Sequence, residues 1–228
     1  MKKIIFLAAV ILVGMALPAQ EFFFPTKEGT VLVYKSFDKK GKELNTLQYT
    51  ITQIKMMGRD MDISYQVESK DNKGKQLYTD EVTVSKKGDK LYLDMSNYIN
   101  KAAFQQNGKI SADVLVTGNN LELPSNPKAG DALPDANVEM SMEMGFMKMK
   151  MSADVTNRKV EAIEDITVKA GTFKSYKFTS DVNSVALGIK IKNSNKEWYA
   201  KGIGMLKTET YDKNGNLQSY MELVELKK

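Results

Sequence analysis

The chain has 228 residues and carries 33 Lys and Arg against 28 Asp and Glu, a formal net charge of +5. It contains no histidine and no cysteine. This composition excludes zinc hydrolases, Ser-His-Asp or Cys-His catalysis and a disulfide framework. The lysines are spread over turns and form no long basic run interleaved with aromatic residues, so we expect no nucleic-acid partner.

Residues 1–20 have the pattern of a secretory signal peptide: a positive start, an apolar run over residues 4–17 and a small-residue break. We expect cleavage after Ala19 or Gln20. Two lysines leave with this segment, so the mature chain carries 31 basic and 28 acidic residues. No later run approaches the ~20 apolar residues of a transmembrane helix. We therefore predict a periplasmic protein of a Gram-negative cell, without a transmembrane segment and without a cysteine for lipid attachment; association with the outer membrane is an alternative.

Short alternating runs separated by polar, Gly-centred turns follow the signal peptide, a pattern typical of an antiparallel meander. The predicted strands of this half span residues 30–37, 44–54, 61–68, 77–84 and 91–94. One helix is predicted over residues 97–106, with Ser96 or Asn97 as N-cap and Asn107-Gly108 as the stop.

The second half continues the strand pattern. A segment rich in Pro and Gly at residues 124–135 is interpreted as a long ordered loop or as a seam between two parts of a sheet. The predicted strands around it span residues 112–117, 120–123, 159–168, 173–182, 185–192, 196–200, 204–211 and 217–226. The fold class is therefore all-β: an antiparallel meander of about a dozen strands forming a barrel or half-barrel, with one or two short helices. We expect residues 21–228 to form one domain, with the possibility of a seam at 124–135.

A run of methionines is the most distinctive feature of the chain. Six of them alternate with polar residues on either side of Gly145-Phe146, which predicts a β-hairpin with a two-residue turn. The expected cross-strand pairs are Met144 with Met147, Met142 with Met149 and Met140 with Met151. The opposite face carries Glu139, Glu143, Lys148 and Lys150. Because that face is charged, we expect the thioether face to be buried against something.

Three interpretations of the thioether face remain open: a core face, the wall of an apolar pocket, or a soft-metal site for Cu(I) or Ag(I). The lack of His and Cys weakens the metal interpretation, and no metal site is assigned. The residues predicted to line a pocket are Met140, Met142, Met144, Met147, Met149, Met151, Phe146 and Trp198.

No catalytic residue is predicted. A functional carboxylate pair needs a cleft with shifted pKa values, and most acidic residues here fall in turns or on exposed strand faces. The segment from Asp212 to Asn216 resembles a calcium loop, but its glycine is at the wrong position, so we interpret it as a turn. We expect neither an enzyme nor a cofactor.

The C-terminal third resembles a known family. Residues 163–178 contain Ala-Gly-Thr-Phe, residues 197–211 begin Glu-Trp-Tyr-Ala-Lys-Gly-Ile-Gly, and a closing strand spans residues 217–226. These patterns are similar to an uncharacterised family of exported envelope proteins, the TapB-like proteins. The resemblance implies a barrel or half-barrel akin to periplasmic lipoprotein carriers and an envelope location; it implies no established activity or catalytic residue.

We therefore expect an exported, non-catalytic binding protein of the cell envelope that holds an apolar or lipid-like ligand or contacts another envelope protein. The alternatives are a methionine-based Cu(I) or Ag(I) binding protein and, third, a purely structural or interaction domain.

Overall fold

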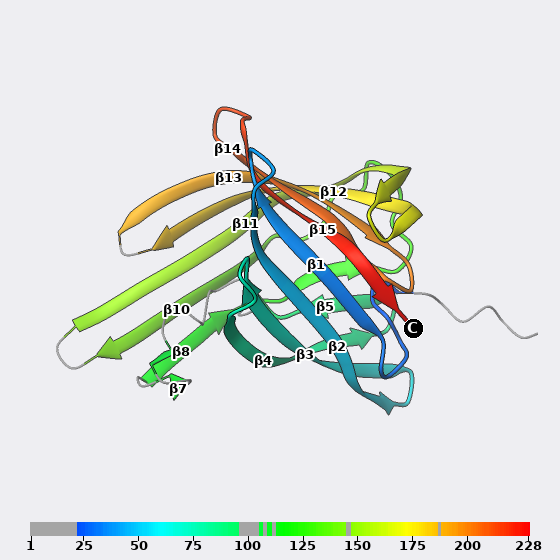
Figure 1. Ribbon diagram of the computed structural model, residues 1–228, viewed down its shortest axis with the longest axis horizontal. Coiled ribbons are helices and arrows are strands. Elements are labelled where there is room, and N and C mark those ends of the chain that lie inside the picture. Colours follow the sequence, from blue (N-terminus) through cyan, green and yellow to red (C-terminus); the bar gives the residue numbers. More distant parts are fainter. Residues whose placement is uncertain (1–21, 96–104, 107–108, 111–112, 145–146, 187) are drawn as a thin grey trace, which may run out of the picture.

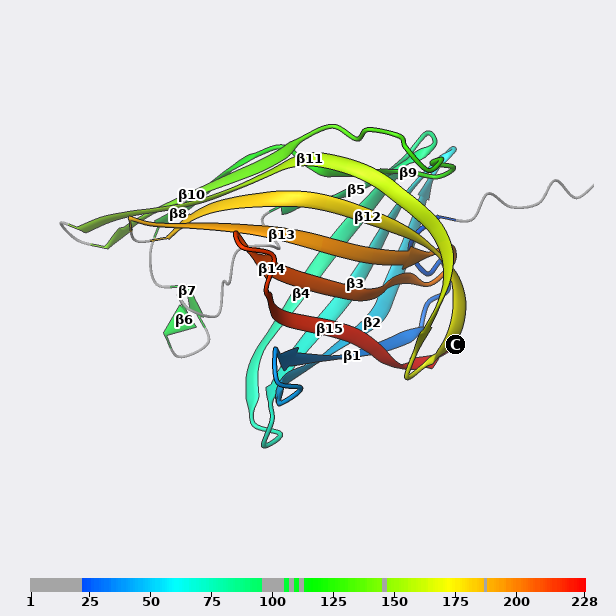
Figure 2. The same cartoon turned by 90° about the horizontal axis from the view of Figure 1, so that it is seen from above.

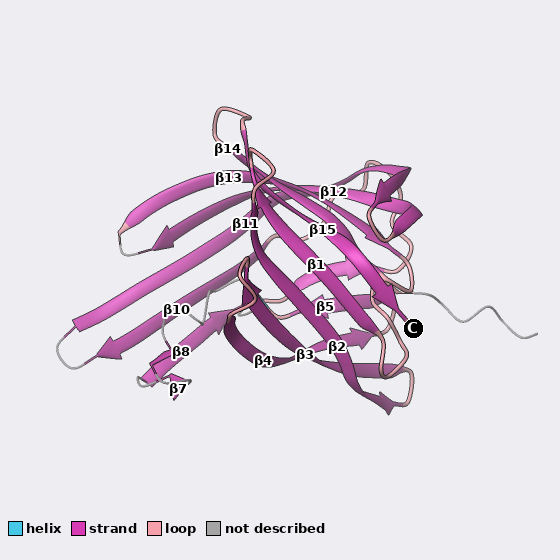
Figure 3. Ribbon diagram, viewed as in Figure 1, coloured by secondary structure: helices cyan, strands magenta, loops and turns pink. Residues whose placement is uncertain are grey.

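The computed structural model describes residues 22–95, 105–106, 109–110, 113–144, 147–186 and 188–228. Fifteen strands lie in these ranges (Figures 1 and 3). They are β1 (Val31–Asp38), β2 (Glu43–Met57), β3 (Asp60–Asp71), β4 (Gln76–Lys87), β5 (Lys90–Leu93), β6 (Gln105–Gln106), β7 (Lys109–Ile110), β8 (Asp113–Gly118), β9 (Leu121–Pro124), β10 (Ala136–Met144), β11 (Met147–Val168), β12 (Gly171–Ala186), β13 (Ile189–Ala200), β14 (Gly204–Asp212) and β15 (Leu217–Lys227).

Thirteen strands form one antiparallel sheet, in the order β8-β10-β11-β12-β13-β14-β15-β1-β2-β3-β4-β5-β9; β6 and β7 pair separately. The sheet curls round without closing (Figure 2), which confirms the predicted all-β half-barrel. Strands from both sides of residues 124–135 belong to this single sheet.

The two edges of the sheet are joined by the chain itself. β8 and β9 lie at opposite edges, yet only Asn119 and Asn120 separate them in sequence. Gly118 makes this connection tight: its φ is +146°, and a Cβ there would lie 2.2 Å from the carbonyl oxygen of Asn137. An L side chain cannot fit, because real Cβ atoms do not approach backbone that closely.

The antiparallel order sorts the turns into two groups. One end of the sheet, which we call the mouth, carries the β2–β3, β4–β5 and β13–β14 turns and residues 22–30. The opposite end, the far end, carries the β1–β2, β3–β4 and β14–β15 turns. The strands between the two ends have 8 to 15 residues. At about 3.3 Å per residue, most of these strands separate a mouth turn from a far-end turn by roughly 30–40 Å.

The predicted methionine hairpin is confirmed in its register. β10 and β11 pair Met140 with Met151, Met142 with Met149 and Met144 with Met147, and Glu143 lies opposite Lys148. The charged face is also confirmed where side chains are described: Lys150 Nζ and Glu139 Oε1 form an exposed ion pair at 3.1 Å.

Three sequence-based boundaries are wrong. The predicted helix at residues 97–106 lies mostly outside the described residues, and its last two residues form strand β6. The predicted strand at residues 185–192 spans the β12–β13 turn. The small polar residues Asn183 and Ser184, which separate two predicted strands, lie inside β12, and the chain turns only between Ala186 and Ile189. The predicted strand at 159–168 is the continuation of β11, which absorbs two bulges and a left-handed Asn157 (φ 52°) without ending.

The buried side chains form two clusters. The larger lies under strands β2 to β5 and β9 to β13 and includes Ile51, Val84 and Leu123. The smaller includes Leu206 and Leu223 and is joined to the tip of the β11–β12 hairpin, whose Ala170 N–H donates to the Leu223 carbonyl at 3.2 Å. Partly buried Leu47, Tyr49 and Met205 pack against both clusters and connect them.

Candidate functional site

The structure places the predicted pocket residues in different surroundings. Met140 is only 3% exposed and belongs to the larger cluster, against which Met151 packs. Trp198 belongs to the smaller cluster, where its Nε1–H donates to Glu164 Oε1 at 2.8 Å. Trp198 and the two methionines whose side chains are described, Met140 and Met151, therefore lie with different clusters.

The rest of the predicted set is described only in part. Met142, Met144, Met147 and Met149 are placed by their strand pairing, but their side chains lie outside the description, as does Phe146 entirely. Neither Met140 nor Met151 lines any of four cavities in the described parts of the chain. The interpretation of the hairpin as a pocket wall stays a prediction.

The neighbours of the hairpin extend its apolar face. Cross-strand pairing aligns Val116, Met140, Met151, Ala186 and Ile189 in one row across β8, β10, β11, β12 and β13. Residues directly opposite one another point to the same side of a sheet. The ends of this row are open, with Val116 38% and Ile189 65% exposed.

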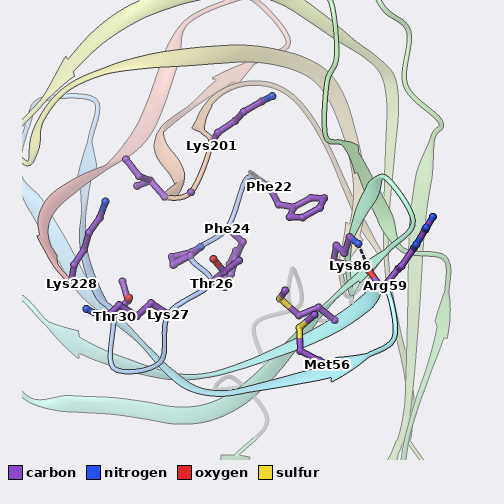
Figure 4. Close-up of a pocket in the computed structure, with 14 residues that line it drawn as sticks. Phe22, Phe24, Thr26, Lys27, Thr30, Met56, Arg59, Lys86, Lys201 and Lys228 are labelled. Carbon is purple, nitrogen blue, oxygen red and sulfur yellow. Dashed lines mark hydrogen bonds between the residues drawn. The ribbon is translucent and has the colours of Figure 1, made fainter. Parts of the chain in front are cut away.

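A cavity lies at the mouth of the half-barrel (Figure 4). It has a volume of about 540 Å³. Its lining residues come from the N-terminal segment, the β2–β3 hairpin, β4, the β13–β14 turn and the chain end: Phe22, Phe24, Pro25, Thr26, Lys27, Thr30, Met56, Arg59, Met61, Lys86, Lys201, Gly202, Ile203 and Lys228.

Three consecutive phenylalanines follow the predicted signal peptide, and the outer two of them, Phe22 and Phe24, form one wall of this mouth cavity. Phe23 is 1% exposed, and its ring contacts Tyr176, Phe178 and Tyr199 edge-to-face with centroids 5.0, 5.7 and 6.2 Å away. Such contacts, together with the buried area of the ring, fix the segment to the sheet. Because Phe23 points into the core, its neighbours are left to line the cavity.

The two neighbouring rings are held differently. Phe24 lies against Tyr65, with ring centroids 5.2 Å apart, while Lys86 Nζ lies 5.0 Å from the centre of the Phe22 ring. The backbone of Phe22 is fixed by the N–H of Gly202, which donates to its carbonyl oxygen at 2.6 Å. The apolar wall is thus tied both to β3 and to the β13–β14 turn.

This wall is absent from the predicted elements, which begin at residue 30. A signal was present in the sequence: three of the nine phenylalanines of the chain are consecutive, and the first of them is the second or third residue after the expected cleavage site. An apolar tripeptide at that place, outside any strand pattern, would have indicated a segment that packs into the fold.

The rim of the mouth cavity is cationic. Five of its lining side chains are basic and none is acidic: Lys27, Arg59, Lys86, Lys201 and Lys228. Lys201 Nζ donates to Asn126 Oδ1 at 2.5 Å, and Lys86 Nζ donates to the Arg59 carbonyl. Within the part of the chain that the structure describes, none of the five forms an ion pair with a carboxylate.

Two acidic side chains at the mouth accept backbone hydrogen bonds. Glu28 Oε1 accepts the N–H of Ile54 at 2.8 Å, and Asp60 Oδ1 accepts the N–H of Gly88 at 2.9 Å. These carboxylates stabilise the hairpins that carry the cavity. The cavity itself presents apolar surface surrounded by positive charge, an arrangement that suits an amphiphile with an anionic end.

No group of three or more His, Cys, Asp or Glu side chains that could hold a metal ion occurs in the described residues. Nor do those residues include a helix with the length and hydropathy needed to cross a bilayer. The fold and the mouth cavity therefore define a β-sheet protein with a concave site large enough for a small molecule.

The comparisons with known proteins place the chain in a family. Residues 27–223 match the DUF3108-like family, and the chain belongs to it. A search of the curated proteins found no match. The matched range includes every strand of the sheet except the end of β15.

Two crystal structures are similar over nearly the whole chain. One is an inferred exported protein with a YmcC-like fold from Bacteroides fragilis NCTC 9343: 25% identity, TM-score 0.76, 91% of this chain and 100% of that one. The other is an inferred lipoprotein from Parabacteroides distasonis ATCC 8503: 26% identity, TM-score 0.75, 91% of this chain and 99% of that one. The sequence resemblance to exported proteins of unknown function agrees with these matches; the TapB-like assignment stays a prediction.

Proposed function

We propose that the chain is an exported, non-catalytic binding protein of the periplasm that holds an apolar or lipid-like ligand in its mouth cavity. The cavity carries the proposal. Its volume of about 540 Å³ lies within the roughly 300–1,000 Å³ of small-molecule sites. Phe22, Phe24 and Met61 supply the apolar wall such a ligand needs.

The export part of the proposal is supported by two independent observations. The sequence begins with the pattern of a signal peptide. The similar structures from Bacteroides fragilis and Parabacteroides distasonis are described as exported and as a lipoprotein. The open half-barrel also fits the carrier-like fold that the sequence resemblance implies.

The apolar row from Val116 to Ile189 offers a second surface that could extend the same role. Its partly exposed ends, together with the adaptability of thioethers, would suit a long acyl chain. A TapB-like relationship would fit this proposal, since those proteins resemble lipoprotein carriers.

Two measurements test the proposal. Native mass spectrometry of the protein from its own periplasm is expected to detect a lipid-sized mass bound to it. Titration of the purified protein with a fluorescent fatty acid is expected to saturate at one site.

The matched variants are Thr26→Trp and Thr79→Trp. Thr26 is exposed and lines the cavity, so an indole there should fill it and weaken binding of the fatty acid about tenfold or more through lost volume. Thr79 is exposed on β4 toward the far end, so the same substitution there should leave binding unchanged. Equal affinity in both variants would show that the cavity is not the site.

A further inference from the structure

We propose that the mouth of the half-barrel docks onto a bilayer surface that contains anionic lipid, with the cations of the rim contacting headgroups and the β2–β3 hairpin inserting at the interface. The inference deepens the proposed function, because a carrier of a lipid-like ligand needs a place to exchange it. It also stands on observations that the proposed function does not use.

The first observation is exposed apolar surface beside the cations. Met56 is 59% exposed and Met57 is 43% exposed, at the end of β2 where the hairpin turns. The cation Arg59 follows within the same turn. Large apolar side chains next to basic ones at the tip of a projecting element are typical of segments that lie in a membrane interface.

The second observation is the distribution of the charge. The rim cations come from five separate parts of the chain and surround one opening (Figure 4). Long Lys and Arg side chains can reach headgroups while their stems lie along apolar surface. A flat anionic surface can contact all five cations at once, whereas one small anion in the cavity cannot.

The third observation is where the chain enters the fold. Phe22 lies at the mouth cavity and is two or three residues beyond the predicted end of the signal peptide. Three residues span at most about 11 Å. During export, while the signal peptide is still in the membrane, the mouth is therefore the part of the folding domain closest to the bilayer.

The test is flotation of the mature protein with vesicles of phosphatidylcholine alone or mixed with phosphatidylglycerol. Binding is expected only to the mixed vesicles and should weaken as salt is raised, because exposed charges are screened over a Debye length of about 10 Å at 0.1 M salt. Binding to neither vesicle at low salt would overturn the inference.

A pair of triple variants locates the surface. Lys27→Gln, Arg59→Gln and Lys228→Gln remove three exposed mouth cations whose side chains form no hydrogen bond within the described residues. Affinity for the mixed vesicles should fall about a hundredfold, since each cation near such a surface contributes about fivefold.

The control triple removes the same charge at the far end of the sheet. Lys39→Gln, Lys73→Gln and Lys213→Gln lie in the β1–β2, β3–β4 and β14–β15 turns and are exposed. This variant should keep binding within about twofold. Equal losses in both triples would mean attraction by net charge alone and would refute a docking face.

Separate variants distinguish this inference from the proposed function. Met56→Ser with Met57→Ser should reduce vesicle binding that persists at high salt. Thr26→Trp should remove fatty-acid binding and leave vesicle docking intact, because it fills the cavity without removing a cation. If Thr26→Trp instead abolishes vesicle binding while the mouth triple does not, a single lipid held in the cavity explains the data and the docking face is wrong.

Discussion

The carbonyl oxygen of Phe22 accepts a 2.6 Å hydrogen bond from the N–H of Gly202, which joins the first described residue of the chain to the β13–β14 turn 180 positions away. This bond and the ring of Phe23 hold the N-terminal segment across the mouth. The segment is thus part of the fold and part of the cavity wall at the same time.

Replacing Phe23 with Ala should destabilise the protein by about 3–5 kcal/mol, since the ring is fully buried and its removal leaves a cavity among three aromatic neighbours. Urea unfolding followed by circular dichroism measures the change. Phe37→Ala is the control: Phe37 stacks on Tyr220 with centroids 4.9 Å apart and is only partly buried, so its loss should cost about 1 kcal/mol. Similar costs for both would mean that the segment is not anchored by Phe23.

Much of the sheet is predictable from sequence, because antiparallel strands with one solvent-exposed face show a strict alternation of apolar and polar residues. Met142 and Met149 could be paired in advance, since the parity of the methionines and the Gly145-Phe146 turn allow only one register. The β12–β13 turn was not predictable in the same way. Asn183 and Ser184 have the composition of a turn but lie inside β12, whereas the chain turns within an apolar stretch between Ala186 and Ile189.

The mouth cavity could not be predicted because its parts are distant in sequence. Lys27, Arg59, Lys86 and Lys201 each fall in or next to a polar turn, where a lysine or arginine alone indicates only solvent exposure. Only the order of strands in the sheet brings those turns to one end. The Trp198 ring was expected in the same interior as the methionines, but β-strand alternation places it beside Glu164 in the smaller cluster.

Asp71 should make the stability of the protein depend on pH in the acid range. Its Oδ1 accepts the N–H groups of Lys75 and Lys73 at 2.9 and 2.8 Å, and these bonds lower the pKa of the carboxyl. Asp38 and Asp212 make the same pair of bonds in their own turns. A lowered folded-state pKa stabilises the protein above the unfolded value of about 3.9, and this contribution is lost as the pH falls through the folded value.

Asp71→Asn and Asp71→Ala separate the charge from the turn geometry. Asn keeps an oxygen acceptor for the turn but lacks the charge, so this variant should unfold at a slightly lower urea concentration than the wild type at pH 7, and the difference should shrink towards pH 3. Ala removes the acceptor, so its midpoint should be lower at pH 7. An Ala variant as stable as the Asn variant would show that the backbone hydrogen bonds contribute nothing.

Glu197 should act in the opposite direction. Burial raises the pKa of its carboxyl, and the Arg158 guanidinium offsets part of that effect. The folded state therefore holds this proton more tightly than the unfolded state, so stability falls as the pH rises from the unfolded value of about 4.3 through the folded value. Glu197→Gln should be more stable than the wild type at neutral pH, and the difference should vanish below the unfolded value. Urea midpoints at several pH values measure this, and a Gln variant that is less stable at neutral pH would contradict it.

The methionine hairpin should not depend on metal for its structure. Met140 is buried among apolar side chains, and its partner Met151 packs against the same cluster, so these two thioethers are used in packing. The remaining pairs can be tested by changing Met142, Met144, Met147 and Met149 to Leu, which preserves volume and removes the sulfur ligands that Cu(I) prefers. We expect Cu(I) titration against a competing chelator to give the same weak affinity for wild type and variant, and the urea midpoints to agree within about 1.5 kcal/mol. A tight, saturable wild-type site that the Leu variant lacks would instead make the hairpin a soft-metal site, since leucine can replace thioether packing but cannot coordinate a metal.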